Sequence, residues 1–202
     1  MRTRNVVLFV SVLLSAVPAL AQDTHSEVSL NVAGFFPKDA TAAGVTDAPS
    51  SAGGLLADYR FQFNRWNAAE ANYSYTRFNQ IYSYSGQSST TSAQANIHEV
   101  SLAYVFTFGR PANARIRPFA EAGVGGLLFA PVTSASVAGA STQGRFAPMY
   151  GGGVDVKVTG RLSLRAGYRG VLYQAPDFSI ATQVTNQWTH LAEPYLGISF
   201  RF

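Results

Sequence analysis

Residues 195–202 read YLGISFRF, and large apolar side chains alternate there with small or charged ones. Successive side chains of an extended strand point to opposite faces, so this stretch has one bulky apolar face and one small, polar face. The apolar face needs an apolar surface or solvent to cover it. The first face carries Leu196, Ile198, Phe200 and Phe202, and the second carries Gly197, Ser199 and Arg201.

The first 21 residues have the pattern of a secretory signal peptide. Arg2 and Arg4 form a short basic head, an apolar run covers residues 6–17, and residues 18–21 (PALA) give a small-x-small cleavage pattern. The run is shorter than the ~20 residues of a spanning helix, which argues against a transmembrane anchor. The sequence therefore predicts a signal peptide over residues 1–21 and one exported domain over residues 22–202.

The composition excludes several classes of function. Two of the 15 basic residues lie in the signal peptide, so 13 basic residues face 11 acidic ones in residues 22–202, and no Lys/Arg cluster indicates a nucleic-acid partner. The chain has no cysteine, which rules out a thiol nucleophile or a Cys-ligated metal. Aromatic residues make up 13% of the chain and charged residues also 13%, which indicates an exported all-β protein.

Alternation of this kind predicts eight strands, joined by connections that are alternately long and short. This layout is typical of an eight-stranded antiparallel up-and-down transmembrane β-barrel with short periplasmic turns and four long outer loops. Closure is required because an unpaired sheet edge cannot face lipid. The expected strands are Val28–Phe36, Gly53–Phe61, Ala68–Thr76, Ile97–Phe108, Ile116–Leu128, Ala147–Val158, Leu162–Tyr173 and His190–Phe202. The expected long loops are residues 37–52, rich in Ala, Gly, Ser, Pro and Asp, residues 77–95, rich in Ser, Thr, Gln and Tyr, and residues 130–145 and 174–189.

A soluble eight-stranded barrel is the structural alternative. It would have to enclose the bulky apolar face, but the interior of an eight-stranded barrel is barely wide enough for side chains. We therefore expect the apolar face to look outward at hydrocarbon, with aromatic residues near the strand ends forming interfacial belts.

The polar face then lines the lumen with acidic and basic residues in equal number, which predicts a structural charge network. The turn near Gly160 places Asp155 opposite Arg165, and barrel closure brings Glu27 toward Arg201. The expected lumen residues are Asp58, Arg60, Glu70, Glu99, Arg117, Glu121, Asp155, Lys157, Arg165, Arg169, Glu193 and Arg201.

The whole pattern resembles the small OmpA/OmpX-type outer-membrane β-barrel superfamily. The resemblance rests on the eight alternating strands, on residues 117–125 (RPFAEAGVG) and 193–197 (EPYLG), and on the final Phe-Arg-Phe. It implies a location in the bacterial outer membrane and contact with its lipid and lipopolysaccharide. It also implies insertion by the barrel-assembly machinery, with Phe200 and Phe202 as the assembly signal. We further expect a monomer without cofactor or metal.

The function follows less directly from the residues. Some small barrels modify lipid A with a His-x-Ser pair on the lipid-facing rim, but Val100 stands where that pattern would place Ser after His98, and His190 has no suitable partner. We therefore expect a non-enzymatic barrel with a plugged lumen that acts through its outer loops. Residues 81–84 (IYSY) are a candidate contact patch. A narrow channel for small solutes is the alternative, and a lipid A-modifying enzyme is a weaker one.

Overall fold

The computed structural model describes residues 26–42, 44–86, 88, 90–108, 114–132 and 139–202. The expected signal peptide lies outside the described residues. Among the described residues, no helix is long and apolar enough to cross a bilayer.

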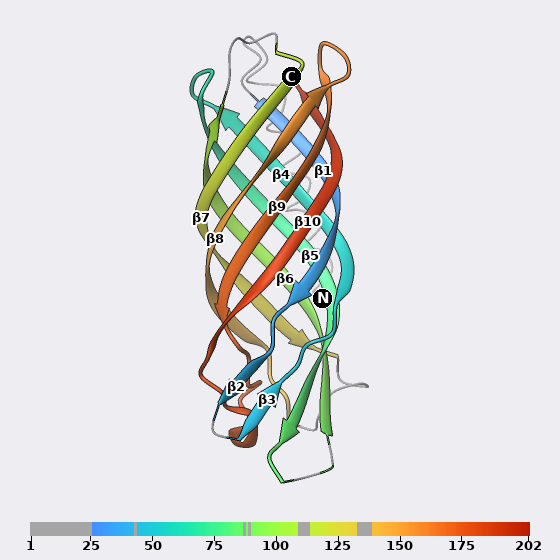
Figure 1. The fold of residues 1–202 in the computed structure, drawn as a ribbon, viewed down its shortest axis with the longest axis vertical. Coiled ribbons are helices and arrows are strands. Elements are labelled where there is room, and N and C mark those ends of the chain that lie inside the picture. Colours follow the sequence, from blue (N-terminus) through green and yellow to red (C-terminus); the bar gives the residue numbers. More distant parts are fainter. Residues whose placement is uncertain (1–25, 43, 87, 89, 109–113, 133–138) are drawn as a thin grey trace, which may run out of the picture.

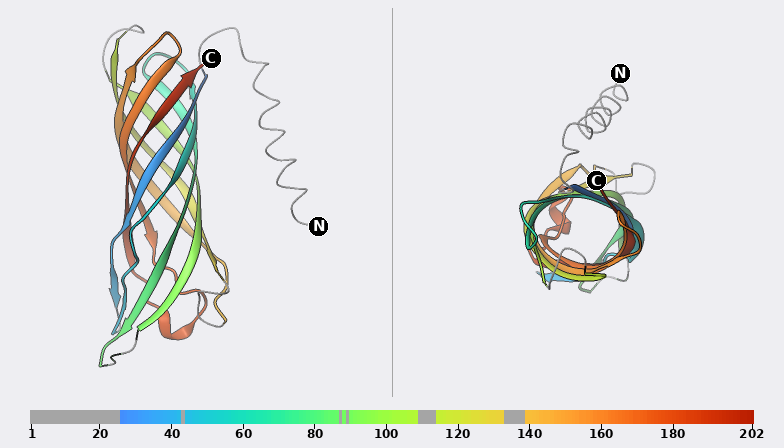
Figure 2. Two further views of the ribbon diagram at one scale, coloured as in Figure 1. Left: turned by 90° about the vertical axis from the view of Figure 1, so that its right-hand side faces the viewer. Right: turned by 90° about the horizontal axis from the view of Figure 1, so that it is seen from above.

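Eight long strands form a closed antiparallel barrel (Figures 1 and 2). Each strand pairs with its neighbours in the chain, and β1 also pairs with β10, from Glu27 opposite Arg201 to Pro37 opposite Leu191. The expected fold class is therefore confirmed. The strands are β1 (Ser26–Pro37), β4 (Ala52–Gln62), β5 (Asn67–Tyr84), β6 (Thr90–Thr107), β7 (Ile116–Pro131), β8 (Gln143–Lys157), β9 (Leu162–Gln174) and β10 (Trp188–Arg201).

The bulky apolar face of the barrel looks outward, as expected. Leu102 is 66% exposed, Val32 and Val100 are 62% exposed, and the terminal strand exposes Leu196 and Ile198 in the same way. An apolar belt of this extent is unfavourable in water and favourable in hydrocarbon, because the transfer of apolar surface out of water lowers the free energy. The fold therefore has the surface of a transmembrane barrel.

The short-turn end of the barrel is closed by local hydrogen bonds. At the β4–β5 turn, Asn64 Oδ1 accepts hydrogen bonds from the backbone N–H groups of Trp66 and Asn67 at 2.9 and 3.0 Å. At the β8–β9 turn, the N–H groups of Val158 and Thr159 both donate to the carbonyl of Leu162. These contacts set the strand register, and with it the face to which each side chain points.

The long-loop end differs from the sequence prediction. In the segment 77–95, expected to be a loop because of its Ser, Thr and Gln content, residues 77–84 and 90–95 instead extend β5 and β6 into a hairpin that projects beyond the barrel (Figure 1). Tyr, Thr and Ile favour strands, and pairing continues from Arg77 opposite Asn96 to Ser83 opposite Thr90. Two short strands of the expected loop 37–52, β2 (Ala40–Ala42) and β3 (Val45–Asp47), continue this sheet.

Candidate functional site

The predicted charged residues lie in the lumen of the barrel. They form two buried clusters and a third group at the mouth of the short-turn end. Arg117, Lys157 and Arg201 lie half-buried at the short-turn mouth, and the others are buried. The buried predicted positions are Asp58, Arg60, Glu70, Glu99, Glu121, Asp155, Arg165, Arg169 and Glu193.

Arg165 is the centre of the first cluster. Its Nε lies 2.7 Å from Asp155 Oδ1, its Nη1 contacts Asp58 Oδ1 and lies 3.5 Å from Glu70 Oε2, and its Nη2 contacts Glu27 Oε1. The expected Asp155–Arg165 pair is therefore present, with the two residues opposite each other in the ladder. One guanidinium offers five N–H donors, so it can serve several carboxylates from different strands at once.

Arg60 is the second cation of this cluster. Its Nε donates to Glu70 Oε2 at 2.6 Å, and its Nη1 lies 3.4 Å from Asp155 Oδ2. The Phe119 ring lies under the guanidinium, 4.4 Å from centroid to Cζ. Asn31 donates to Asp58 Oδ2 at 2.8 Å. Buried charges are tolerated when they are paired and hydrogen-bonded in this way.

Glu27 joins this cluster although it was expected only as the partner of Arg201. Arg201 Nη2 does lie 3.0 Å from Glu27 Oε2, but Glu27 also contacts Arg165 and accepts a hydrogen bond from Ser199 at 2.6 Å. The carboxylates of the lumen therefore outnumber the six predicted. Glu27 is separated from Ser29 and Asn31 by even numbers of positions on β1, so all three side chains point inward. This spacing is the sequence signal that identifies Glu27 as a lumen residue.

Arg169 is the centre of the second cluster. Its Nη2 contacts Glu99 Oε1, and its Nε lies 3.5 Å from Glu193 Oε2. Glu99 also accepts hydrogen bonds from Ser74 and Ser101 at 3.2 and 3.1 Å. By contrast, the oxygens of Glu121 and Glu193 accept no hydrogen bond from the described residues. The second cluster is thus less completely bonded than the first.

The outer part of the lumen is filled by apolar side chains, a feature that the sequence did not predict. Phe129 packs against Tyr173 and Phe178 with ring centroids 5.7 and 6.4 Å apart. Phe35, Phe78 and Tyr82 belong to the same buried cluster. The strand residues of this cluster alternate with outward-facing residues, so the sequence could have identified them as inward-facing. Phe178 belongs to the β9–β10 loop, where no alternation indicates its direction.

Residues 175–187, which include the short 3-10 helix η2 (Ala181–Gln183), fold back over this apolar cluster. Tyr82 donates from its hydroxyl to the carbonyl of Pro176 at 2.8 Å, and Gln143 donates to Asp177 Oδ1 at 2.7 Å. Burial raises the pKa of Asp177, but hydrogen bonds from Gln143 and the Ser179 N–H, with Arg145 3.3 Å away, outweigh it and lower the pKa. We call residues 175–187 the outer cover.

Tyr82 therefore does not belong to an exposed contact patch. It was expected there with its neighbours in residues 81–84, but it is fully buried and holds the outer cover. Ile81 remains 36% exposed. The hairpin extension turns alternate side chains inward, which a loop would not do.

Asp47, on β3 outside the barrel, gives a pH prediction. Burial first, and then the negative charge of Asp39, raise the pKa of Asp47 to about 8. In the unfolded chain this carboxyl titrates near pH 3.9. Between these two pH values the folded outer sheet binds a proton that the unfolded chain lacks, so the stability of this sheet falls as pH rises. The equilibrium constant for its opening increases roughly tenfold per pH unit.

We expect Asp47→Asn to remove this dependence. Hydrogen exchange of the Val45 and Thr46 amides, compared between wild type and variant at each pH, measures the opening of the outer sheet. The sheet of the wild type should open progressively more easily up to about pH 8, and that of the variant should not. Asp39→Asn is the matched control, because Asp39 is exposed, and it should weaken the dependence only slightly. Equal pH profiles for wild type and Asp47→Asn would contradict the assignment.

The two described histidines lie among tyrosines near the long-loop end. Tyr73 Oη is 2.8 Å from His98 Nδ1, and His190 Nε2 is 3.1 Å from Tyr150 Oη and 3.4 Å from Tyr168 Oη. Neither contact includes a serine or a carboxylate. No group of three or more potential ligands within the described part of the chain could hold a metal ion.

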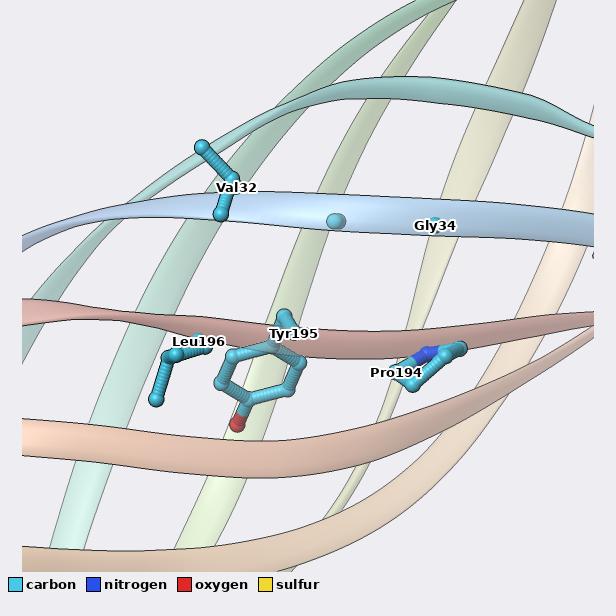
Figure 3. A pocket seen from close by; sticks show the side chains of 6 residues that line it. Val32, Gly34, Pro194, Tyr195 and Leu196 are labelled. Atoms are coloured by element: carbon cyan, nitrogen blue, oxygen red, sulfur yellow. The ribbon is translucent and has the colours of Figure 1, made fainter.

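A shallow groove of about 320 Å³ marks the outer wall between β1 and β10 (Figure 3). Pro194 lacks an N–H group, and no ladder pair is formed between Ala33–Tyr195 and Phe36–Ala192. Figure 3 shows Gly34 of β1 across from Pro194 of β10, with Val32 and Leu196 further along the two strands. The groove belongs to the lipid-facing wall and brings no reactive side chain together.

Comparison with solved structures gives the same fold. OprG of Pseudomonas aeruginosa has 13% identity and a TM-score of 0.64, with 89% of this chain and 96% of that chain covered. Neisserial surface protein A has 16% identity and a TM-score of 0.59, covering 88% and 97%. Ail, the attachment invasion locus protein of Yersinia pestis, has 15% identity and a TM-score of 0.51, covering 90% and 100%.

No protein of curated function matches the chain at a significant level. The family described as the outer membrane protein beta-barrel domain, however, matches residues 7–199, nearly the whole sequence. This match agrees with the closed barrel, its exposed apolar belt and its charged interior. The chain therefore belongs to the outer membrane protein beta-barrel domain family, and it is a transmembrane protein of the outer membrane of Gram-negative bacteria.

Proposed function

We propose that this protein is a non-enzymatic outer-membrane barrel with a closed lumen, which acts through its outer surface. The observation that carries the proposal is the double filling of the lumen. Arg60, Arg165 and Arg169 cross it as fully buried side chains, and the aromatic cluster with Phe129 and Phe178 fills it further out. A solute would have to displace both layers.

The charged layer favours a plug over a narrow channel. In the first cluster each guanidinium is bound by carboxylates from more than one strand, for example Arg165 by Asp58 of β4 and Asp155 of β8. Separating buried ion pairs costs several kcal/mol, because each charge would lose its partner in a poorly solvated site. The network therefore supports a structural role for these residues.

The surface role is supported by the shape of the long-loop end. The β5–β6 hairpin projects beyond the barrel with Ile81 exposed. Tyr82 of the same hairpin holds the outer cover through its hydrogen bond to the carbonyl of Pro176. Ail, which shares the fold, is named for attachment and invasion, and a structure of it with the heparin analogue sucrose octasulfate has a TM-score of 0.51. The proposal places lipopolysaccharide and surface partners at this end.

The remaining partners are part of the same proposal. Outer-membrane lipid would contact the apolar belt, and the barrel-assembly machinery would insert a monomer by reading β10 with Phe200 and Phe202. Both aromatic rings lie at the end of the closing strand, with centroids 6.4 Å apart. This position supports their role as an assembly signal.

Planar-bilayer recording of the refolded protein tests the closed lumen. We expect no steady unitary current from wild type, and none from a variant whose residues 176–186 are replaced by a short Gly-Ser linker, because the charged layer remains. A porin recorded in the same bilayers is the control for insertion. Steady unitary currents from wild type would overturn the plug and favour the channel.

The non-enzymatic part of the proposal has its own test. His98 and His190 contact tyrosines rather than a serine or carboxylate, so we expect lipid A from cells that express the protein to keep its mass. An altered mass that disappears in His98→Ala would establish the enzyme alternative.

A further inference from the structure

Four cationic side chains meet at the periplasmic mouth of the barrel. Arg117 of β7, Lys157 of β8, Arg161 of the β8–β9 turn and Arg201 of β10 line a small hollow together with Gly160 and Ser163. Its free volume is about 10 Å³, which is room for about one water molecule. We call this set of residues the basic mouth.

The basic mouth has more positive charge than its neighbours neutralise. Lys157 and Arg161 form no ion pair with any described residue, and Arg117 Nε is buried without a hydrogen-bond partner. The carboxylates that pair with the basic mouth among the described residues are Glu27, which lies 3.0 Å from Arg201 Nη2, and Asp155. Both are 1% exposed and already bound by Arg165, and Arg117 reaches each of them only at 3.6 Å.

The described cations at the other end of the barrel are Lys38, Arg77 and Arg145. Arg145 is paired with Asp177 at 3.3 Å, Arg77 Nε donates to Asn96 Oδ1 at 2.6 Å, and Lys38 is followed directly in the chain by Asp39. At the periplasmic end, the β4–β5 turn carries a single described cation, Arg65, which lies over the Trp66 ring at 5.1 Å. The surplus charge is thus concentrated on one side of one mouth.

The chemistry of the basic mouth selects its ligand. Arginine and lysine side chains only donate hydrogen bonds, so the complementary group must accept several and carry negative charge. Arginine forks suit the oxygens of phosphate, and lysine adds a point charge. The hollow is too small for a whole metabolite, so the ligand would offer a terminal group at the opening. A Cβ added at Gly160 would meet nothing within 4 Å, so the turn side of the opening is clear.

We propose that the basic mouth binds a phosphate group presented from the periplasmic side. Free phosphate and the headgroup of an anionic phospholipid share this chemistry. The second source has support in the wall, where Val158 and Ile116 are 55% and 60% exposed beside the mouth and could contact the acyl chains. Basic residues at a membrane surface attract anionic lipid. This site does not depend on whether the lumen conducts.

The first arm of the test uses inorganic phosphate. The full chain, refolded in nanodiscs of phosphatidylcholine, is titrated with phosphate at constant ionic strength while the amide signals of Gly160 and Ser163 are followed by NMR. We expect saturable shifts in wild type. The Lys157→Gln/Arg161→Gln variant should weaken binding by about tenfold or more, because each charge-assisted hydrogen bond contributes appreciably. Arg65→Gln, at the opposite turn, is the matched control and should bind as wild type does.

The second arm uses lipid. Wild type, the double variant and Arg65→Gln are refolded in nanodiscs that contain phosphatidylcholine and phosphatidylglycerol, and retained lipid is measured by native mass spectrometry. Phosphatidylglycerol retained by wild type and Arg65→Gln but lost from the double variant assigns the site to a lipid headgroup. Saturable phosphate shifts without such retention assign it to a free phosphate. Absence of both, or binding that survives in the double variant, overturns the proposal.

Discussion

Replacement of Arg165 by leucine is expected to destabilise the barrel by at least about 3–5 kcal/mol, or to prevent refolding altogether. The guanidinium binds four carboxylates from different strands, and all of them are at most 4% exposed. Leucine fills part of the space but leaves these charges without their main partner. Breaking a buried ion pair by removal of one member is far more costly than replacing the whole set.

Urea unfolding of the refolded protein, followed by fluorescence of Trp66 and Trp188 and by heat-modifiable mobility on gels, measures this loss. Arg165→Lys should fall between wild type and Arg165→Leu, because lysine keeps the charge but loses the planar fork. Glu121→Gln is the matched control within the lumen: its oxygens form no ion pair and accept no hydrogen bond from described residues, so the change should stay below about 1 kcal/mol. Wild-type stability of Arg165→Leu would refute the central role of Arg165.

Gly123→Ala is expected to have the second large effect. A Cβ at this position on β7 would lie 2.1 Å from the carbonyl oxygen of Leu102 and 2.6 Å from the Cα of Ala103, both backbone atoms of β6. Backbone atoms in a paired strand cannot move aside as a flexible side chain can, so β6 and β7 would have to separate. We expect a loss of about 1–3 kcal/mol or more, together with a reduced refolding yield.

Gly144→Ala is the control for this prediction. Gly144 lies on β8, and an added Cβ there would meet nothing within 4 Å. The substitution should be neutral or stabilise by up to about 1 kcal/mol, because alanine reduces the entropy of the unfolded chain. The same urea and gel measurements apply to both variants. If Gly123→Ala and Gly144→Ala refolded with equal yield and stability, the close approach of β6 to β7 would be wrong.

The large differences between sequence and structure lie at the long-loop end. The alternation of Phe78, Gln80 and Tyr82 is regular enough to extend β5, but the abundance of Ser, Thr and Gln favoured a loop. Amino-acid composition is a poor guide to the solvent exposure of a segment that pairs with a strand on each side. Tyr82 and Ser83 of β5 lie in such a segment, between β3 and β6. Phe178 could not be placed at all, because a loop residue has no periodic face.

The sequence by itself determined the eight barrel strands, their order and the face to which the side chains of the expected strands point. These are local properties, because a period of two depends only on neighbouring residues and short turns set the register between them. The pair Asp155 and Arg165 could therefore be predicted across a single turn. The same logic assigned an apolar outer face and a charged lumen.

Only the tertiary structure decided which charges meet across the lumen. Arg165 reaches Asp58 and Glu27, which are 107 and 138 residues away in the chain, and the basic mouth gathers side chains from four strands and a turn. Such distances depend on the tilt and stagger of the closed barrel, and these belong to all eight strands together. The filling of the outer lumen by Phe178 was likewise decided by how the β9–β10 loop folds back, because nothing in the local sequence of a loop fixes its direction.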